Sequence, residues 1–240
     1  MATIKHSKII ITITILVFCG NPVDSRNESA NSKSNMTVFS LDDGNQCTLI
    51  YSIKIKQEWL DSLKVKYVWN DFDEYDNRLW EHMYTLFDPM VENSGAKNSN
   101  ELWQNLTRGQ KLFWSFLAFN GDTDNGGVYQ FFSNRPEHAV SVLEVWHELN
   151  IDRLEKDYKA TLEELVGKTD KISEFRTKFN EQDSDWNERW EAFNEGYKEL
   201  PSAEAIEEYY YDKEFKRTLF KALTDYIENN IEQFALVTDN

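Results

Sequence analysis

One pair of residues in this 240-residue chain has the type and spacing of metal ligands. Glu144 and His147 form a Glu-x-x-His pattern on a predicted helix, which is the spacing that di-iron helical bundles use. Such a site needs two of these pairs and two further glutamates that face inward. His82 and His138 have no glutamate three residues before them, so the second pair is missing. We therefore interpret Glu144 and His147 as neighbours on a helix surface and predict no metal site and no cofactor.

A second pattern resembles the start of a calcium-binding loop but lacks its last ligand. Asp122 and Asp124 stand two positions apart, as the first acidic residues of a calcium loop do. The twelfth position is Ser133, where a calcium loop requires a bidentate glutamate. The sequence therefore does not predict calcium binding.

The compact motifs that identify common enzyme classes do not occur in the sequence. There is no Gly-x-Ser-x-Gly nucleophile motif, no phosphate-binding loop and no dinucleotide fingerprint. Cys47 lies in a possible strand, and no neighbouring residue marks it as an activated thiol. We predict that the chain is not an enzyme and has no catalytic residues. The 42 acidic residues could still include a catalytic pair of carboxylates, so an unrecognised hydrolase stays an alternative.

The segment from Asp122 to Asn134 is the most distinctive stretch of the chain. Asp124 or Asn125 can cap a helix, and the two glycines that follow allow left-handed backbone or the close approach of another segment. Polar residues four apart then share one face of a helical turn, and two phenylalanines between them can anchor the turn in the core. These positions are Asn125, Gly126, Gly127, Gln130, Phe131, Phe132 and Asn134.

These seven residues resemble the signature of the DNA-mimic protein family. The aromatic-rich helix before them and the pattern from Tyr210 to Asn229 are also similar, so that the resemblance covers roughly residues 70 to 235. It implies an all-helical domain without known enzyme activity. One branch of the family is thought to imitate DNA with an acidic surface and to occupy a DNA-binding protein. The alternative for the Asn-Gly-Gly corner is a purely structural role.

The charge of the chain points to the same kind of partner. The formal net charge is −16, and the stretch from Glu181 to Glu214 holds twelve acidic residues against three basic ones. Direct binding to nucleic acid is disfavoured, because it requires cations that displace condensed counterions. We therefore expect a basic protein as the partner, with solubility as the alternative explanation of the charge.

One predicted helix, residues 184–199, separates its aromatic and acidic residues. Its Trp, Phe and Tyr residues follow each other at spacings of three and four, whereas its glutamates fall on the opposite face. Acidic residues of the following segment would have to lie alongside to give a dense surface. The predicted acidic face consists of Glu188, Glu191, Glu195, Glu199, Glu204, Glu207, Glu208 and Asp212.

The first 36 residues read as an export signal and a tether. Residues 1–18 combine a basic start with a ten-residue apolar run, which is too short to span a bilayer. The run ends at Cys19-Gly20, which resembles a bacterial lipoprotein signal in which Cys19 is lipidated. Residues 19–36 are nearly free of apolar side chains and predict a flexible tether. We expect an exported protein held at the cell envelope by a lipid anchor, with a periplasmic or secreted protein as the alternative.

The elements that position these residues are mainly helical. Few glycines and prolines and a helical hydrophobic period predict an all-α fold with a single multi-helix domain over residues 37–240. Thr107 is a predicted helix cap, and the helix after it is apolar nearly all round and should be buried. Asp88-Pro89 is expected to end an earlier helix. Residues 36–57 fit a small β-hairpin that turns at Asp43-Gly44, or an irregular lead-in. Further helices are expected at 137–149, 151–166, 170–181, 184–199 and 203–233.

The leading hypothesis is a non-enzymatic, envelope-attached acidic protein that binds a basic protein through a helical face. A second hypothesis, from another class, is an immunity-like inhibitor that protects the envelope against a toxin. An unrecognised hydrolase is the third. Electrostatic recognition should weaken steeply with salt, whereas a tight inhibitor complex should resist it.

Overall fold

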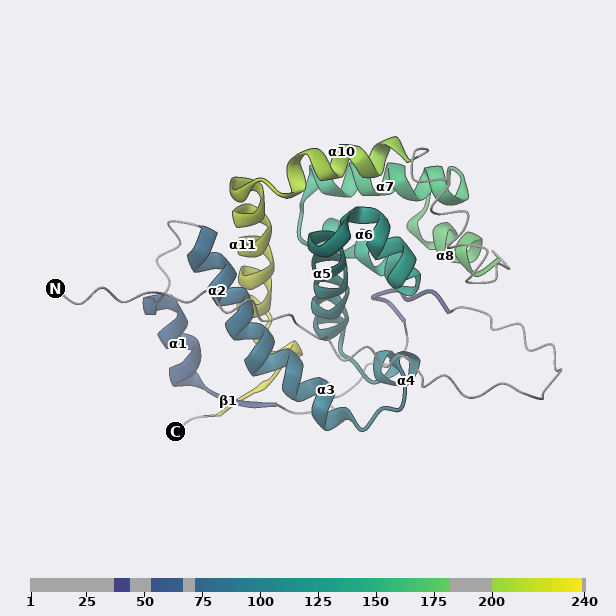
Figure 1. The fold of residues 1–240 in the computed structure, drawn as a ribbon. Helices are drawn as coiled ribbons and strands as arrows, with labels where there is room; N and C mark the ends of the chain where they lie inside the picture. Colours follow the sequence, from purple (N-terminus) through teal and green to yellow (C-terminus); the bar gives the residue numbers. More distant parts are fainter. Residues whose placement is uncertain (1–36, 44–52, 67–71, 182–199, 239–240) are drawn as a thin grey trace, which may run out of the picture. The chain divides into compact units, whose positions relative to one another are not determined.

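A computed structural model describes residues 37–43, 53–66, 72–181 and 200–238. These residues are predominantly helical, which confirms the all-α prediction (Figure 1). The expected signal peptide, the tether and the helix at 184–199 lie outside the described residues. The elements are β1 (Lys54–Lys56), α1 (Gln57–Lys66), α2 (Phe72–His82), the π-helical turn η1 (Met83–Phe87), α3 (Asp88–Ser94), α4 (Ser99–Gln104), α5 (Arg108–Asn134), the 3-10 turn η2 (Pro136–His138), α6 (Ala139–Glu148), α7 (Asp152–Val166), α8 (Ile172–Glu181), α10 (Pro201–Tyr210), α11 (Lys213–Asn229), the 3-10 turn η4 (Ile231–Gln233) and β2 (Leu236–Thr238).

Helix α5 is the centre of the core. It begins at the predicted cap, where the Thr107 hydroxyl accepts a hydrogen bond from Gln110 N and the Gln110 side chain accepts one from Thr107 N, a capping box. Phe116 and Phe119 are fully buried, and the ring of Phe119 packs edge-on against Trp146 of α6. The prediction of a buried central helix is confirmed, and α5 is the element against which the other helices are fixed.

Two pairs of helices complete the packing. Helix α10 lies along α7, and helix α11 lies along α2 (Figure 1). In the first pair, Ser202 bonds to Glu164 and Tyr209 bonds to Asp157, so the two helices run antiparallel. This arrangement exposes the outer face of α10 while its inner face contacts α5 and α7.

The C-terminal region departs from the single helix expected at 203–233. The helix stops at Tyr210, and Asp212 begins a new one, because its carboxylate accepts hydrogen bonds from Glu214 N and Phe215 N, both at 3.0 Å. An aspartate in this position satisfies backbone N–H groups that have no partner inside the helix. The hydrophobic residues keep their helical spacing across the break, so this spacing does not reveal in the sequence that one helix ends and another begins.

The prediction that Asp88-Pro89 ends a helix is wrong. The helical path continues from Phe72 to Ser94, with Pro89 in the first turn of α3. The π-helical turn before it lets Asp88 N donate to Met83 O, one residue further back than in an α-helix. A residue in the first turn of a helix does not need a backbone N–H for the helical hydrogen bonds. Pro89 therefore does not interrupt the helical path.

The described residues do not form the expected hairpin. Residues 37–43 contain no strand, and β1 pairs in parallel with β2 near the other end of the chain, with Ile55 opposite Val237. Ile55 is buried between two exposed lysines, which is the alternation of a half-buried strand. The irregular lead-in is therefore the better description of residues 37–43. None of the helices in the described ranges combines the length and apolarity that crossing a bilayer requires.

Candidate acidic interaction surface

The two glycines of the central motif kink α5. Gly126 and Gly127 leave helical backbone, and Gly127 has φ 86° and ψ 175°, a region that is essentially restricted to glycine. The kink frees the backbone N–H of Val128, which donates to Glu207 Oε1 of α10 at 2.7 Å. A Cβ atom at position 127 would lie 2.3 Å from the same oxygen. Gly127 therefore serves both the backbone conformation and the close approach of α10, as the sequence predicts for this pair of glycines.

A buried lysine and two tyrosines fasten the segment before the kink. Lys216 of α11 is 5% exposed, and its Nζ donates to Asn120 Oδ1 and Asp124 Oδ1, both at 2.7 Å. Tyr210 donates to the same Asn120 oxygen at 2.8 Å, and Tyr211 donates to a backbone carbonyl of α5. Burial lowers the pKa of Lys216, while the Asp124 carboxylate acts in the opposite direction. These contacts fix the start of α11 and the end of α10 on α5.

The polar residues of the motif bind within the corner. Gln130 and Asn134 both donate to Asp122 Oδ1, at 3.3 and 2.9 Å. Arg135 contributes a cation 3.5 Å from the other oxygen of this carboxylate. Asp122 is outside the motif that the sequence singles out, so its role as the shared acceptor was missed.

The remaining motif residues divide between core and surface. Phe131 is fully buried and Phe132 is 8% exposed, with its ring stacked on Tyr158 at 5.5 Å. Asn125 is exposed. We refer to residues 120–134 and their contacts with α10 and α11 as the α5 corner. In the structure, the corner determines where α10 lies.

Three of the predicted acidic residues are exposed on α10 and at the cap of the next helix. Glu204 and Glu208 are four positions apart on α10, so they share one face of that helix about 6 Å apart, and Asp212 is the N-cap of α11. We call these three residues the carboxylate row. Glu207 belongs to the predicted acidic face but points to the α5 corner instead. Glu188, Glu191, Glu195 and Glu199 lie outside the described residues.

The negative charges of the carboxylate row are little neutralised by the basic side chains that the structure describes. Among the residues that the structure describes, Glu204 and Glu208 make no ion pair. Asp212 uses one oxygen as the cap of α11. The nearby guanidinium of Arg153 on α7 lies 3.6 Å above the ring of Tyr209, between the two helices. Like charges at this spacing destabilise a helix by a few tenths of a kcal/mol per pair, a cost that a cationic partner would remove.

Glu144 and His147, interpreted from the sequence as neighbours on a helix surface, contact different partners, and Glu144 is half-buried. The Glu144 carboxylate accepts hydrogen bonds from Ser40 Oγ at 2.8 Å and Leu41 N at 2.6 Å, and burial raises its pKa. His147 Nδ1 lies 3.0 Å from Glu155 Oε1 on α7. No cluster of three potential metal ligands occurs within the described ranges.

A serine–histidine contact that the sequence did not reveal lies in the core. Ser115 Oγ is 3.2 Å from His138 Nδ1 and donates to Ser141 Oγ at 2.8 Å, and all three side chains are fully buried. Burial lowers the pKa of His138 to about 3, so the imidazole is neutral. The rings of Phe39, Trp103 and Trp114 lie 5.0 to 5.4 Å from the imidazole. The geometry is that of a core hydrogen-bond network without access for a substrate.

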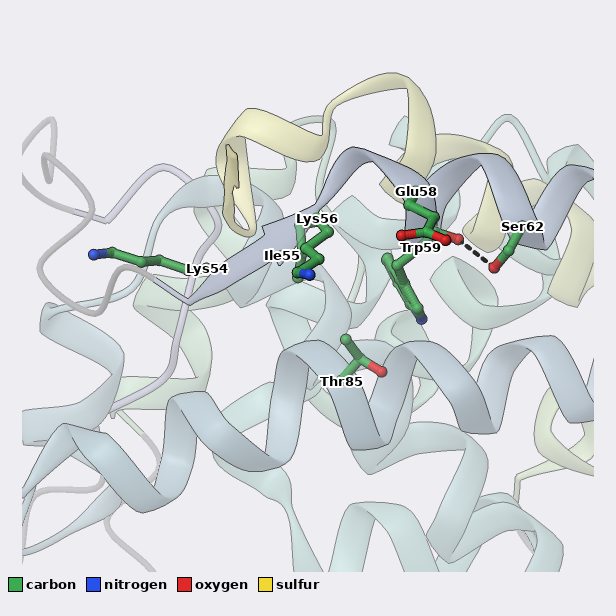
Figure 2. Close-up of a pocket in the computed structure, with 7 residues that line it drawn as sticks. All are labelled: Lys54, Ile55, Lys56, Glu58, Trp59, Ser62 and Thr85. Carbon is green, nitrogen blue, oxygen red and sulfur yellow. Dashed lines mark hydrogen bonds between the residues drawn. The ribbon is translucent and has the colours of Figure 1, made fainter. Parts of the chain in front are cut away.

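An open pocket lies beside β1, α1 and η1, and none of its described lining residues belongs to the networks above. Its volume is about 430 Å³, and Trp59 points from α1 toward Thr85 of η1 (Figure 2). The Lys54 side chain extends away from the other lining residues (Figure 2). Among the described residues that line the pocket, Glu58 is the one carboxylate. The lining residues are Lys54, Ile55, Lys56, Glu58, Trp59, Ser62 and Thr85.

Comparison with known proteins gives one family. The family model described as DMP19-like protein matches residues 104–230, which is more than half of the 240-residue chain. This range includes the α5 corner and the carboxylate row, whereas β1, α1, α2 and α3 lie outside it. No curated protein and no solved structure matches the chain.

Proposed function

The chain belongs to the DMP19-like protein family, and on that premise we propose that it is a non-enzymatic acidic protein that binds a basic protein partner. The observation that carries the proposal is the carboxylate row on α10. Its three side chains are exposed, Glu204 and Glu208 form no ion pair with any residue that the structure describes, and α10 bonds to the α5 corner through Glu207. In this proposal, the corner is the support and the row is part of the contact surface.

The spacing of the carboxylates limits how closely the carboxylate row can resemble DNA. Glu204 and Glu208, about 6 Å apart along α10, are sparser than the charges of duplex DNA, which presents one charge per about 1.7 Å of axis. A DNA-like surface therefore requires further acidic residues beside the row. We propose that Glu188, Glu191, Glu195 and Glu199 supply them, and that the partner presents a DNA-binding or otherwise basic surface.

Variants of the carboxylate row distinguish binding of a basic partner from the alternative that the acidic residues only keep the protein soluble. Replacement of Glu204 and Glu208 by glutamine removes two charges and leaves the Asp212 cap intact. The matched control replaces Glu58 of α1 and Glu92 of α3, which are also exposed. A partner captured by the chain should leave the first double variant at lower salt than the control. Equal elution from both variants and from the unchanged chain would favour solubility.

The second acidic set can be tested separately. Reversal of Glu188, Glu191, Glu195 and Glu199 to lysine should abolish capture of the same partner, because four attractive contacts become repulsive. A complex that survives this reversal and also resists high salt would instead support the immunity-like inhibitor. That outcome would place the contact outside the acidic face.

We further propose, from the N-terminal sequence alone, that the domain is attached to the cell envelope through lipidated Cys19. Labelling of cells with a radioactive or clickable fatty acid tests this proposal. The label should be lost in Cys19→Ser and retained in Cys47→Ser. Retention of the label in Cys19→Ser would contradict it.

A further inference from the structure

Residues 37–43 are bound to the helical domain in the manner of a peptide ligand. They contain neither helix nor strand, and their backbone groups bond to groups far away in the sequence. Val38 N donates to Asn180 Oδ1 at 3.1 Å, Phe39 N donates to Glu137 O at 2.7 Å, and Leu41 N donates to Glu144 Oε2 at 2.6 Å. We call residues 37–43 the strap.

Apolar side chains anchor the strap. Val38, Phe39 and Leu41 are at most 3% exposed. The ring of Phe39 stacks on Trp103, with 4.4 Å between the centroids and an angle of 8° between the planes. Phe39 therefore occupies the position of an aromatic anchor in a site whose other walls include His138. Such buried aromatic residues dominate the binding energy of many peptide interfaces.

Cations of the domain meet the acidic end of the strap. The Asp42 carboxylate pairs with Arg108 and the Asp43 carboxylate pairs with Arg176. Lys111, which is 2% exposed, donates to the backbone carbonyl of Asp43. In a chain with a net charge of −16, this concentration of basic groups complements two consecutive aspartates.

The strap and most of the residues that contact it come from different parts of the chain. Arg108, Glu144 and Arg176 lie on α5, α6 and α8, inside the range that matches the family. Trp103 of α4 lies one residue before that range, and the strap lies well outside it. We call the residues that contact the strap the strap site; they are Trp103, Arg108, Lys111, Glu137, His138, Glu144, Arg176 and Asn180.

We propose that the strap site is a second interaction site, which recognises a short acidic peptide and is occupied by the chain's own strap. The recognised pattern is an aliphatic residue, an aromatic residue, serine and an aliphatic residue, followed by two carboxylates in a turn. A partner protein with an exposed segment of this chemistry binds when it displaces the strap. The strap site uses residues other than the carboxylate row and takes a ligand of opposite charge, so the inference does not depend on the proposed function.

Fluorescence polarisation with a labelled peptide of residues 37–43 tests the proposal. The full chain with Phe39→Ala and Leu41→Ala has a weakened strap and should bind the peptide at least tenfold more tightly than the unchanged chain, since a competing internal segment lowers apparent affinity. Addition of Arg176→Ala to this variant should weaken the binding about tenfold, because an ion pair to the peptide is lost. A peptide with alanine at the Phe39 position is the ligand control.

Two outcomes would overturn the proposal. One is equal affinity of the peptide for the weakened and unchanged chains, or binding that ignores both Arg176→Ala and the alanine peptide. The other is loss of the folded state, measured by circular dichroism, in the Phe39→Ala/Leu41→Ala chain and also in a milder Asp42→Asn/Asp43→Asn chain. Unfolding of both would make the strap an inseparable part of the core.

Discussion

The carboxylate of Glu207 accepts a hydrogen bond from the backbone N–H of Val128 at 2.7 Å, across the kink that Gly126 and Gly127 make in α5. One acidic residue of α10 therefore fixes the helix on the core, while Glu204 and Glu208 of the same helix face solvent. The contact links the Asn-Gly-Gly motif to the helix that carries Glu204 and Glu208. It also explains why the motif requires glycine where α10 approaches.

The conformation of Gly127 predicts a substitution effect that an ordinary positive-φ glycine does not show. Gly127→Asn should lower the free energy of unfolding by about 3 kcal/mol, because the side chain is strained at φ 86°, ψ 175° and meets Glu207. Gly95→Asn is the matched control, since Gly95 has φ 64° and ψ 8° with open space around it. Asparagine tolerates that region, so the control should lose no more than about 1 kcal/mol. Equal losses in urea unfolding would contradict the assigned role of the kink.

The hydrogen bond that Glu207 accepts from Val128 N predicts that replacing Glu207 and replacing its neighbour Glu208 change stability by different amounts. Glu207→Ala should lower stability by about 1 kcal/mol, as loss of a helix N-cap does. Glu208→Ala removes the same charge from an exposed site and should change stability by less than about 0.5 kcal/mol. Thermal or urea unfolding of the two variants measures the difference. Similar stabilities would show that the bond to Val128 contributes little.

Burial of His138 predicts a specific pH dependence of stability. Its pKa is about 3 in the folded chain and about 6.5 when unfolded, so between these values the unfolded state binds one more proton. Stability should therefore fall as the pH falls from 6.5, with a contribution of about 1.4 kcal/mol per pH unit from this residue. His138→Phe should remove that contribution from the slope. Urea unfolding at several pH values below 6.5 measures the slope, and an equal slope in the unchanged chain and in His138→Phe would contradict this role of His138.

Local features of the fold were accessible from the sequence, whereas their distant partners were not. Thr107 caps α5 as expected, since a cap depends on residues three positions away. The left-handed backbone and close approach expected of the two glycines occur at Gly127. Glu207, the partner of Val128, lies 79 positions further along the chain, and no local feature of the sequence distinguishes it from Glu204 and Glu208. Only the packing of α10 on α5 separates the acid that supports the corner from those that face solvent.

Two other differences have similar causes. The break at Asp212 falls within a continuous hydrophobic period, so the period obscured a cap that the aspartate itself could have indicated. The strap has no hydrophobic period, and its anchors depend on residues of α4, α5, α6 and α8. Hydrophobic periodicity identifies helices and strands that bury one face. An irregular segment such as the strap has no repeating face, so periodicity cannot identify it.

Capture with a salt gradient tests whether the carboxylate row binds a basic protein. The unchanged chain, the Glu204→Gln/Glu208→Gln chain and the Glu58→Gln/Glu92→Gln chain are immobilised in parallel, exposed to lysate of the native organism and eluted with rising salt. Our account predicts one basic protein that leaves the unchanged chain and the control at the same moderate salt, and leaves the row variant earlier. Elution of every captured protein at the same salt from all three chains would contradict it.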